Sequence, residues 1–362
     1  MIVLDLATEL EAAAHAATTT LTSGLIEALR RFPNSTVSDD DSTLSFAAVY
    51  EAALRRSAVL RGRFAVGDPV VLRSRNTIGF LIDLLGYLLA GLRPILTVGT
   101  GVSSAQLRHM RERATPDCDF DWSAVALYLA SAGSSGGPKL TPRTHTDYAL
   151  NIWLAARNAE LTPYDCYLVS IPAAQNYALA CPGILGALLS GSRVALTWAT
   201  DYEGISAAIA RHRATVLPVL ATQARPWYAA AAQADSPVRL VQVCGRGVTA
   251  ADVHALGGLF GATVQHSFGT DAGLLCQSAP SDDLARRAAG IGRLLSERDE
   301  FRIVDPDAAG HGWLEVRGPC TVTTYLAAPN VDTTTFTKDG WLRTGDLARA
   351  VDERHFVVHA PE

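Results

Sequence analysis

A glycine- and serine-rich segment near residue 135 carries the residue types that bind phosphate. Residues 127–130, Leu-Tyr-Leu-Ala, form a short apolar run that is typical of a buried strand. The run opens into residues 131–137, Ser-Ala-Gly-Ser-Ser-Gly-Gly, in which no side chain is larger than a hydroxymethyl group. Such a loop lets backbone N–H groups and hydroxyls approach an anionic oxygen, and Lys139 adds a positive charge. The segment therefore predicts a phosphate-binding loop.

Three other interpretations of this loop compete with that prediction. A Walker A loop needs Gly before its Lys and Ser or Thr after it, whereas Pro138 precedes Lys139 and Leu140 follows it. Residues 133–137 match G-x-S-x-G, the nucleophile elbow of hydrolases, which must lead directly into a helix. Pro138 and Pro142 fall where that helix would run. The Walker A loop is excluded, and the hydrolase elbow and a plain surface turn remain as weaker alternatives.

Residues 131–148, SAGSSGGPKLTPRTHTDY, resemble the phosphate loop of the adenylate-forming enzymes, the family of acyl-CoA synthetases and peptide-synthetase adenylation domains. The ending PKLTPRTH resembles the stand-alone aryl-acid–AMP ligases of siderophore pathways, which activate salicylate or 2,3-dihydroxybenzoate. Matches extend from about Ser45 to the last residue. The resemblance implies the large N-terminal domain of this fold.

The resemblance also implies a nucleotide site, with ATP and Mg²⁺ as cofactors. Adenylation places a carboxylate oxygen in line with the α-phosphate, so catalysis consists mainly of positioning and charge neutralisation. Residues 344–346, Thr-Gly-Asp, match the family segment whose aspartate accepts hydrogen bonds from both ribose hydroxyls. The implied catalytic residues are Lys139, Arg246 and His145. The implied cofactor-binding residues are Ser131, Gly133, Ser134, Ser135, Gly136, Lys139, Gly245, Phe268, Gly269, Thr270 and Asp346.

Residues 175–183 resemble the family segment that builds the acyl pocket. Relatives that activate amino acids carry aspartate where Asn176 stands, and an amide instead offers both a donor and an acceptor to an ortho hydroxyl. Cys181 and Leu275 stand where dihydroxybenzoate-activating relatives carry serine and valine, which resembles the salicylate-activating members. Simple core packing remains the alternative for both. The implied substrate-binding residues are Asn176, Tyr177, Cys181, Gly245 and Leu275.

Several positions depart from the family pattern. Ala272 occupies the place of a glutamate that helps to hold Mg²⁺, and Asp271 is the neighbouring carboxylate. Gln175 stands where histidine is usual, and Arg246 would either crowd ATP or pair with a carboxylate or phosphate. The resemblance also implies a hinge and a C-terminal domain with a catalytic lysine, which we expect to be absent because the chain stops at Glu362. Because one lost electrostatic stabiliser costs about 10²–10³ in rate, we expect impaired or partner-dependent ATP chemistry.

Three functions remain open on these grounds. The first is an aryl-acid adenylate-forming ligase for a salicylate-like acid in a siderophore or other secondary-metabolite pathway, acting with an aryl carrier protein or a synthetase. The second is a repurposed scaffold that does not use ATP and transfers or condenses an aryl group activated elsewhere, as a thioester or aryl-AMP. The third is a non-catalytic interaction partner of a synthetase.

Composition excludes several classes of protein. The 362 residues are 48% hydrophobic and 19% charged with a net charge of −5, which disfavours disorder and nucleic-acid binding. The N-terminus lacks a basic region, and the apolar stretch 78–92 is too short to span a bilayer, so we expect no signal peptide and no membrane segment. The six cysteines and nine histidines show no metal-ligand spacing, so we expect no metal-binding residues. A cytoplasmic location follows as an expectation.

The periodicity of the chain predicts how these residues are positioned. Strands and helices alternate up to about residue 266, which predicts largely parallel sheets in paired α/β subdomains over residues 1–273. Short strands with Gly, Pro and Asp turns then predict a small, barrel-like β-rich subdomain over residues 274–362. The expected helices are 6–32, 45–64, 78–90, 183–189 and 202–212, and the expected strands are 70–72, 94–98, 127–130, 167–171, 193–197, 215–219, 240–243, 263–266, 301–304, 312–317 and 356–358.

Overall fold

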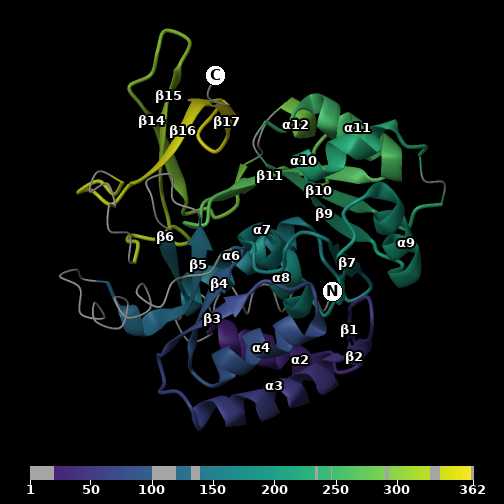
Figure 1. The fold of residues 1–362 in the computed structure, drawn as a ribbon. Helices are drawn as coiled ribbons and strands as arrows, with labels where there is room; N and C mark the ends of the chain where they lie inside the picture. The colour runs from purple at the N-terminus through teal and green to yellow at the C-terminus, as the bar shows by residue number, and fades with distance from the viewer. Residues whose placement is uncertain are drawn as a thin grey trace.

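The computed structural model describes residues 20–99, 120–131, 139–232, 235–245, 247–289, 293–326 and 335–359. In these residues, three sheets and their helices form an α/β fold (Figure 1). Two of the sheets are largely parallel and the third is antiparallel, which confirms the fold class that the sequence predicts.

The first sheet has nine strands in the order β13-β12-β11-β10-β9-β7-β8-β1-β2. Neighbours from β11 to β1 are parallel, and β2, β12 and β13 pair antiparallel at the two ends. The strands are β1 Thr36–Ser38, β2 Thr43–Ser45, β7 Cys166–Val169, β8 Arg193–Leu196, β9 Val216–Leu220, β10 Leu240–Cys244, β11 Thr263–Gly269, β12 Leu275–Gln277 and β13 Arg293–Leu294.

The second sheet has four strands in the order β3-β4-β5-β6, and the phosphate-loop segment lies between its last two strands. β3, β4 and β5 are parallel, whereas β6 returns antiparallel to β5. The loop therefore leads into a strand that contains Pro142, and not into the helix that a hydrolase elbow requires. The strands are β3 Pro69–Arg73, β4 Arg93–Thr97, β5 Val125–Ser131 and β6 Lys139–Thr144.

The third sheet is antiparallel, in the order β14-β15-β16-β17, and lies at the upper left of Figure 1. Its core cluster includes Ala272, Leu274 and Cys276, so apolar packing joins it to the end of the first sheet. β12 and β13 come after residue 273 in the chain and still pair with the first sheet. The expected division of the chain after residue 273 stays a prediction. The strands are β14 Glu300–Val304, β15 His311–Arg317, β16 Leu342–Ala350 and β17 Phe356–His359.

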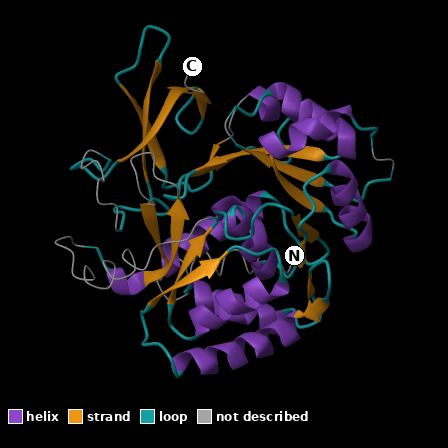
Figure 2. Ribbon diagram, in the orientation of Figure 1, coloured by secondary structure: helices purple, strands orange, loops and turns teal. Residues whose placement is uncertain are grey.

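Helices fill the layer between the first two sheets (Figure 2). α2, α3, α4, α6 and α8 pack on one another, and their apolar side chains share one cluster with Leu96 of β4 and Val169 of β7. α9 and α11 cover the opposite face of the first sheet. The helices are α2 Leu21–Arg31, α3 Phe46–Arg61, α4 Ile78–Leu89, α6 His145–Asn158, α7 Asn176–Ala180, α8 Gly183–Leu189, α9 Tyr202–His212, α10 Ala221–Ala224, α11 Ala250–Phe260 and α12 Leu284–Ala289, with 3-10 turns η1 Trp122–Ala124 and η2 Arg225–Ala229.

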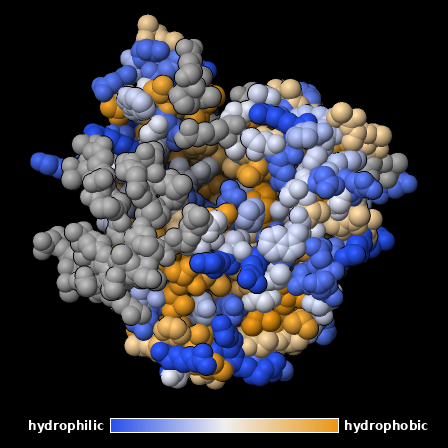
Figure 3. All heavy atoms as spheres, viewed as in Figure 1, coloured by the Kyte–Doolittle hydropathy of each residue, from blue (hydrophilic) through white to orange (hydrophobic). Residues whose placement is uncertain are grey.

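The apolar helix that the sequence predicts at residue 78 is a core element. α4 begins at the cap Thr77, whose side chain accepts a hydrogen bond from the Phe80 amide, and eight of its twelve residues are buried. No helix in the described part of the chain is long and apolar enough to cross a membrane. Hydrophilic side chains are spread over much of the face drawn in Figure 3.

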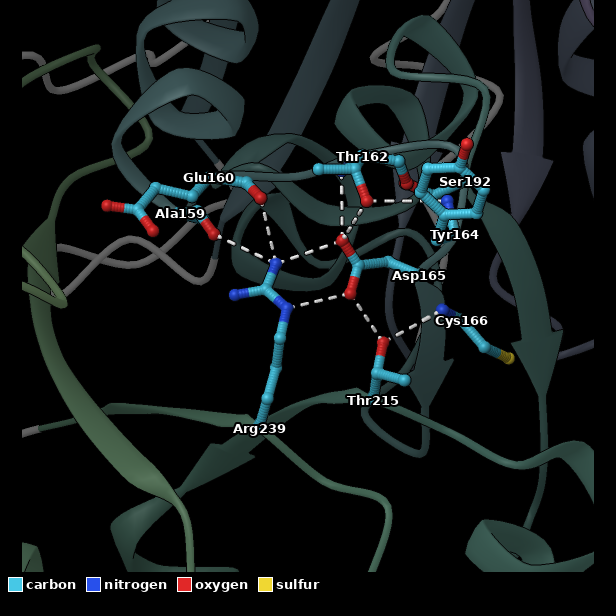
Figure 4. Close-up of polar contacts among 9 residues, drawn as sticks. All are labelled: Ala159, Glu160, Thr162, Tyr164, Asp165, Cys166, Ser192, Thr215 and Arg239. Atoms are coloured by element: carbon cyan, nitrogen blue, oxygen red, sulfur yellow. Dashed lines mark hydrogen bonds and ion pairs between the residues drawn. The ribbon is translucent and has the colours of Figure 1, made fainter.

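A polar network joins the amino-terminal ends of parallel strands to the end of α6 (Figure 4). The Asp165 carboxylate accepts hydrogen bonds from Arg239 Nε at 2.8 Å, from Thr215 Oγ1 at 2.7 Å and from the amide and hydroxyl of Thr162. Arg239 also donates to the carbonyls of residues 159 and 160. Burial raises the pKa of Asp165, but the hydrogen bonds from Arg239 and Thr215 outweigh it and hold the pKa below its usual value.

We expect Asp165→Asn to lower the free energy of unfolding by about 2 kcal/mol at neutral pH, because an amide cannot accept all these hydrogen bonds. The carboxylate stabilises the fold above the pKa of an unfolded aspartate, about 4, and this contribution is lost as the pH falls through the folded pKa. The difference between wild type and variant, measured by urea unfolding, should therefore narrow below about pH 4. Glu51→Gln, which removes an exposed ion pair with Arg55, is the control and should change little. A pH-independent difference would contradict this account.

Candidate functional site

Several of the predicted substrate and nucleotide residues lie at one edge of the nine-stranded sheet. Gly245 directly follows β10, Gly269 ends β11 and Thr270 comes next, and Asn176 begins α7 after the loop that follows β7. β7, β9, β10 and β11 are parallel neighbours, so their carboxyl ends meet at this edge. Ligands of open α/β sheets bind beyond the carboxyl ends of the strands.

Four of the five predicted acyl-pocket residues are buried. Tyr177, Cys181 and Leu275 belong to one buried apolar cluster, and this cluster also contains Tyr148 of α6. Asn176 is 9% exposed, and its Oδ1 accepts a hydrogen bond from the Tyr148 hydroxyl at 2.9 Å. The structure thus places a buried amide in contact with this largely apolar cluster, and small-molecule pockets commonly combine the two.

Two thiols beside these residues are neutral. Burial, together with the nearby Cys244, raises the pKa of Cys181 to about 12, and burial raises the pKa of Cys244 to about 12. A thiolate nucleophile needs a lowered pKa, so both cysteines act here as small apolar side chains.

Two of the residues that are predicted to bind ligand have a buried polar atom without a hydrogen-bond partner among the described residues. These atoms are the Tyr177 hydroxyl and Thr270 Oγ1. The contact of Tyr177 with Ser267 falls short of hydrogen-bond geometry. Burial, with Cys244 and Tyr167 nearby, holds the pKa of Tyr177 well above its usual value, so the phenol stays protonated. A buried polar group without a partner is costly. Both atoms therefore fit a site that is completed by a polar ligand such as a nucleotide and an acyl group.

A buried guanidinium connects this edge to the rest of the fold, and the sequence did not predict it. Arg143 of β6 is 0% exposed, and its Nε lies 2.6 Å from Asp147 Oδ1. The same group donates to the carbonyls of Asp271 and Cys320 and lies 4.5 Å from the centre of the Tyr148 ring. Asp147 also completes the capping box of α6. The Thr-x-x-Asp spacing at residues 144–147 was the sequence signal that could have revealed this cap.

Ala272, which stands where the family resemblance implies a glutamate, is buried. Ala272 is 3% exposed, and its carbonyl accepts a hydrogen bond from the Val322 amide at 2.8 Å. The neighbouring Asp271 interacts electrostatically with Arg143, Tyr148 and Cys181. Burial raises the pKa of Asp271, and the charge of Arg143 opposes this. No group of three His, Cys, Asp or Glu in the described ranges is placed to hold a metal ion.

The turn that presents Thr270 and Asp271 requires glycine at its ends. Gly273 has φ +110°, and a Cβ there would lie 1.6 Å from the carbonyl oxygen of Cys320. A Cβ at Gly269 would lie 2.9 Å from the carbonyl oxygen of Leu274. The turn therefore packs tightly against the residues that follow β15 in the third sheet, which fixes the position of the turn.

Lys139 and His145 lie at the second sheet, and Phe268 belongs to β11 of the first sheet. Lys139 begins β6, and its Nζ lies 5.3 Å from the centre of the Tyr325 ring. His145 begins α6, and burial together with the charge of Arg93 lowers its pKa against the effect of Asp147. Phe268 packs edge-on against Phe356 of β17, with ring centres 6.2 Å apart.

Asp346 lies in a bulge of β16. The pairing of β15 and β16 shifts register between Trp313 and Glu315, and Gly345 adopts φ +80° within the extra residues of β16. The Thr344 side chain donates to the Leu314 carbonyl and accepts from the Asp346 amide. A bulge re-aims a side chain relative to its strand, which gives Asp346 a direction different from that of its strand neighbours. Its ribose-binding role stays a prediction.

Several predicted residues cannot be placed. Gly133, Ser134, Ser135, Gly136 and Arg246 lie outside the described residues, and of Ser131 only the backbone, at the end of β5, is described.

A separate cavity of about 720 Å³ contains none of the predicted site residues. It lies between α6 and the segment 279–298, and Trp153, Arg157 and Arg298 are among its lining side chains.

Comparison with known proteins agrees with the geometry. The family model of AMP-binding enzymes matches residues 114–326. Pyochelin synthase PchD of Pseudomonas aeruginosa is 29% identical over 88% of this chain and 70% of its own. A salicyl-AMP ligase / salicyl-S-ArCP synthetase of Mycobacterium tuberculosis is 30% identical over 98% of this chain and 75% of its own. The apo structure of Mycobacterium smegmatis MbtA superposes with a TM-score of 0.85 and 31% identity, over 97% of this chain and 78% of that one.

The family model covers more than half of the chain, and the mycobacterial relatives match nearly all of it. The phosphate-loop resemblance, the fold and the sheet-edge site point the same way. This chain therefore belongs to the family of AMP-binding enzymes.

Proposed function

We propose that this protein activates a salicylate-like aromatic acid as its acyl adenylate, in a siderophore or other secondary-metabolite pathway. The carboxylate oxygen would attack the α-phosphorus of ATP, and pyrophosphate would leave. The observation that carries the proposal is the buried, neutral amide of Asn176, which the Tyr148 hydroxyl holds near the edge of the sheet that carries Gly245 and Thr270. The salicyl-AMP ligase named among the relatives supports the choice of acid.

The pocket chemistry favours an uncharged ortho substituent. An amide offers hydrogen bonds without charge, so it suits a hydroxyl group better than an ammonium group. Cys181, with its raised pKa, and Leu275 add apolar surface for an aromatic ring. In this proposal Asn176, Tyr177, Cys181, Gly245 and Leu275 bind the aryl acid. The acceptor of the acyl group would be an aryl carrier protein or a synthetase.

The nucleotide would lie across the ends of β10 and β11. Lys139 and the loop that precedes it would neutralise phosphate charge, Gly245 and residues 268–270 would line the nucleotide, and Asp346 would bind the ribose. When bound, Mg²⁺ would supply further charge neutralisation. We propose that ATP chemistry is nevertheless impaired or partner-dependent, because Ala272 offers no carboxylate for the metal.

One observation favours an alternative function. Asp271 brings a carboxyl group next to Arg143, Tyr148 and Cys181, close to where the anionic acid would bind. A site that receives an aryl thioester or aryl-AMP made elsewhere need not bind the free carboxylate. The alternative is therefore transfer or condensation of a pre-activated aryl group without ATP.

ATP–pyrophosphate exchange tests the proposal. We expect exchange that requires salicylate and is weaker with benzoate. Lys139→Met should lower the exchange rate by about 10²–10³, because it removes one electrostatic stabiliser of the transition state. Lys338→Met is the matched control, since Lys338 is exposed in the turn that precedes β16 of the third sheet. It should leave the exchange rate unchanged. Absence of exchange with any aromatic acid, with or without a carrier partner, would reject adenylation and favour the alternative.

Asp271 predicts how the affinity for the acid depends on pH. The raised pKa means that the group loses its proton at a higher pH than a free aspartate. Affinity for the aryl carboxylate should therefore fall as the pH rises through this pKa, because two negative charges then face each other. We expect Asp271→Asn to remove this dependence and to bind salicylate about tenfold more tightly near neutral pH.

Calorimetric titration across the acidic to neutral range measures both effects. Asp283→Asn, at an exposed position in front of α12, is the charge-matched control. Equal affinities and equal pH profiles for wild type and Asp271→Asn would show that Asp271 does not face the acid.

A further inference from the structure

Tyr148 of α6 contacts Asn176, one of the predicted pocket residues. Tyr148 is 0% exposed, and its hydroxyl donates to Asn176 Oδ1 at 2.9 Å. Burial keeps the pKa of Tyr148 well above its usual value, although the charge of Arg143 opposes this. The phenol is therefore protonated and has a hydrogen to donate.

This hydrogen bond fixes which end of the amide faces Tyr148. A buried hydroxyl hydrogen needs an acceptor, and the amide oxygen supplies one. Rotating the amide by half a turn would place an NH₂ group where Oδ1 now lies, and the hydroxyl hydrogen would lose its acceptor. The Tyr148 ring cannot easily move away, because the Arg143 guanidinium lies 4.5 Å from its centre and is held by Asp147.

With Oδ1 committed to Tyr148, the Nδ2 group points in another direction. In the described part of the chain, the Asn176 side chain makes one hydrogen bond, in which its Oδ1 accepts from the Tyr148 hydroxyl. Asn176 therefore offers donors to a ligand. A donor recognises the oxygen of an ortho hydroxyl as an acceptor, and the hydroxyl hydrogen can then bond internally to the neighbouring carboxylate.

We propose that Tyr148 is a positioning residue that sets the substrate specificity: it orients the Asn176 amide so that the pocket requires a hydrogen-bond acceptor ortho to the carboxylate. This inference rests on the proposed function, since it assumes that an aromatic acid binds beside Asn176. It adds a residue from α6, outside the pocket segment, and a direction to the hydrogen bond that selects the acid.

The test is calorimetric binding of salicylate, benzoate and 2-aminobenzoate to wild type and Tyr148→Phe. Phenylalanine keeps the aromatic ring over Arg143 and removes only the hydroxyl. We expect the preference of wild type for salicylate over benzoate to fall about tenfold in the variant, with benzoate affinity nearly unchanged. We also expect 2-aminobenzoate, whose ortho group is mainly a donor, to gain relative to salicylate. An unchanged salicylate-to-benzoate ratio in folded Tyr148→Phe would overturn the inference.

Two further variants make the test specific. Tyr228→Phe removes a partly buried hydroxyl that donates to Asp252 at 3.0 Å. This variant should keep the wild-type ratio of salicylate to benzoate affinity. Asn176→Asp keeps an acceptor for Tyr148 but has no donor, so it should lose salicylate and gain 2-aminobenzoate even if Tyr148→Phe does not fold. Retained preference for salicylate in Asn176→Asp would overturn the inference. If wild type binds none of the three acids, the proposed function itself fails; if wild type discriminates and the variants do not change this, only the role of Tyr148 fails.

Discussion

The fold around the site depends on one buried positive charge. Arg143 is 0% exposed, so its guanidinium must be neutralised and its donors must be satisfied inside the protein. Asp147 supplies the charge, and the carbonyls of Asp271 and Cys320 supply acceptors. These partners belong to α6, to the turn after β11 and to the connection that follows β15 in the third sheet. One side chain thus fixes three elements relative to the strand that follows the phosphate-loop segment.

This arrangement relates the two halves of the proposed site to each other. The ring of Tyr148 lies against Arg143, and its hydroxyl holds Asn176, so the acyl side is fixed from α6. The turn at residues 269–273 packs against Cys320 so closely that Gly273 has no room for a Cβ, which fixes Thr270 on the nucleotide side. Each side has one buried polar atom that lacks a hydrogen-bond partner among the described residues. It is the Tyr177 hydroxyl on the acyl side and Thr270 Oγ1 on the nucleotide side. A ligand with an acyl and a nucleotide part would satisfy both.

Sequence patterns predicted many of the local elements, but not α6 or α11, and they predicted few of the long-range contacts. α9 was expected over residues 202–212 and is Tyr202–His212, because its apolar spacing and its cap Asp201 are local signals. β6 was not predicted, because Pro142 lowers the strand tendency of its sequence. The burial of Arg143 could not be predicted, since arginine is rarely buried and two of its partners are 128 and 177 residues away. The acyl-pocket residues were found through family resemblance, whereas their hydrogen bond to Tyr148 required the fold.

The central claim is that the aryl pocket and the nucleotide edge form a single adenylate-forming site. Calorimetric titration of the protein with a non-hydrolysable salicyl-AMP mimic, with salicylate and with ATP–Mg²⁺ tests this most directly. A single site predicts that the mimic binds far more tightly than either part, since one ligand then gains both sets of contacts without a second loss of translational freedom. A mimic that binds no more tightly than salicylate alone would contradict the claim.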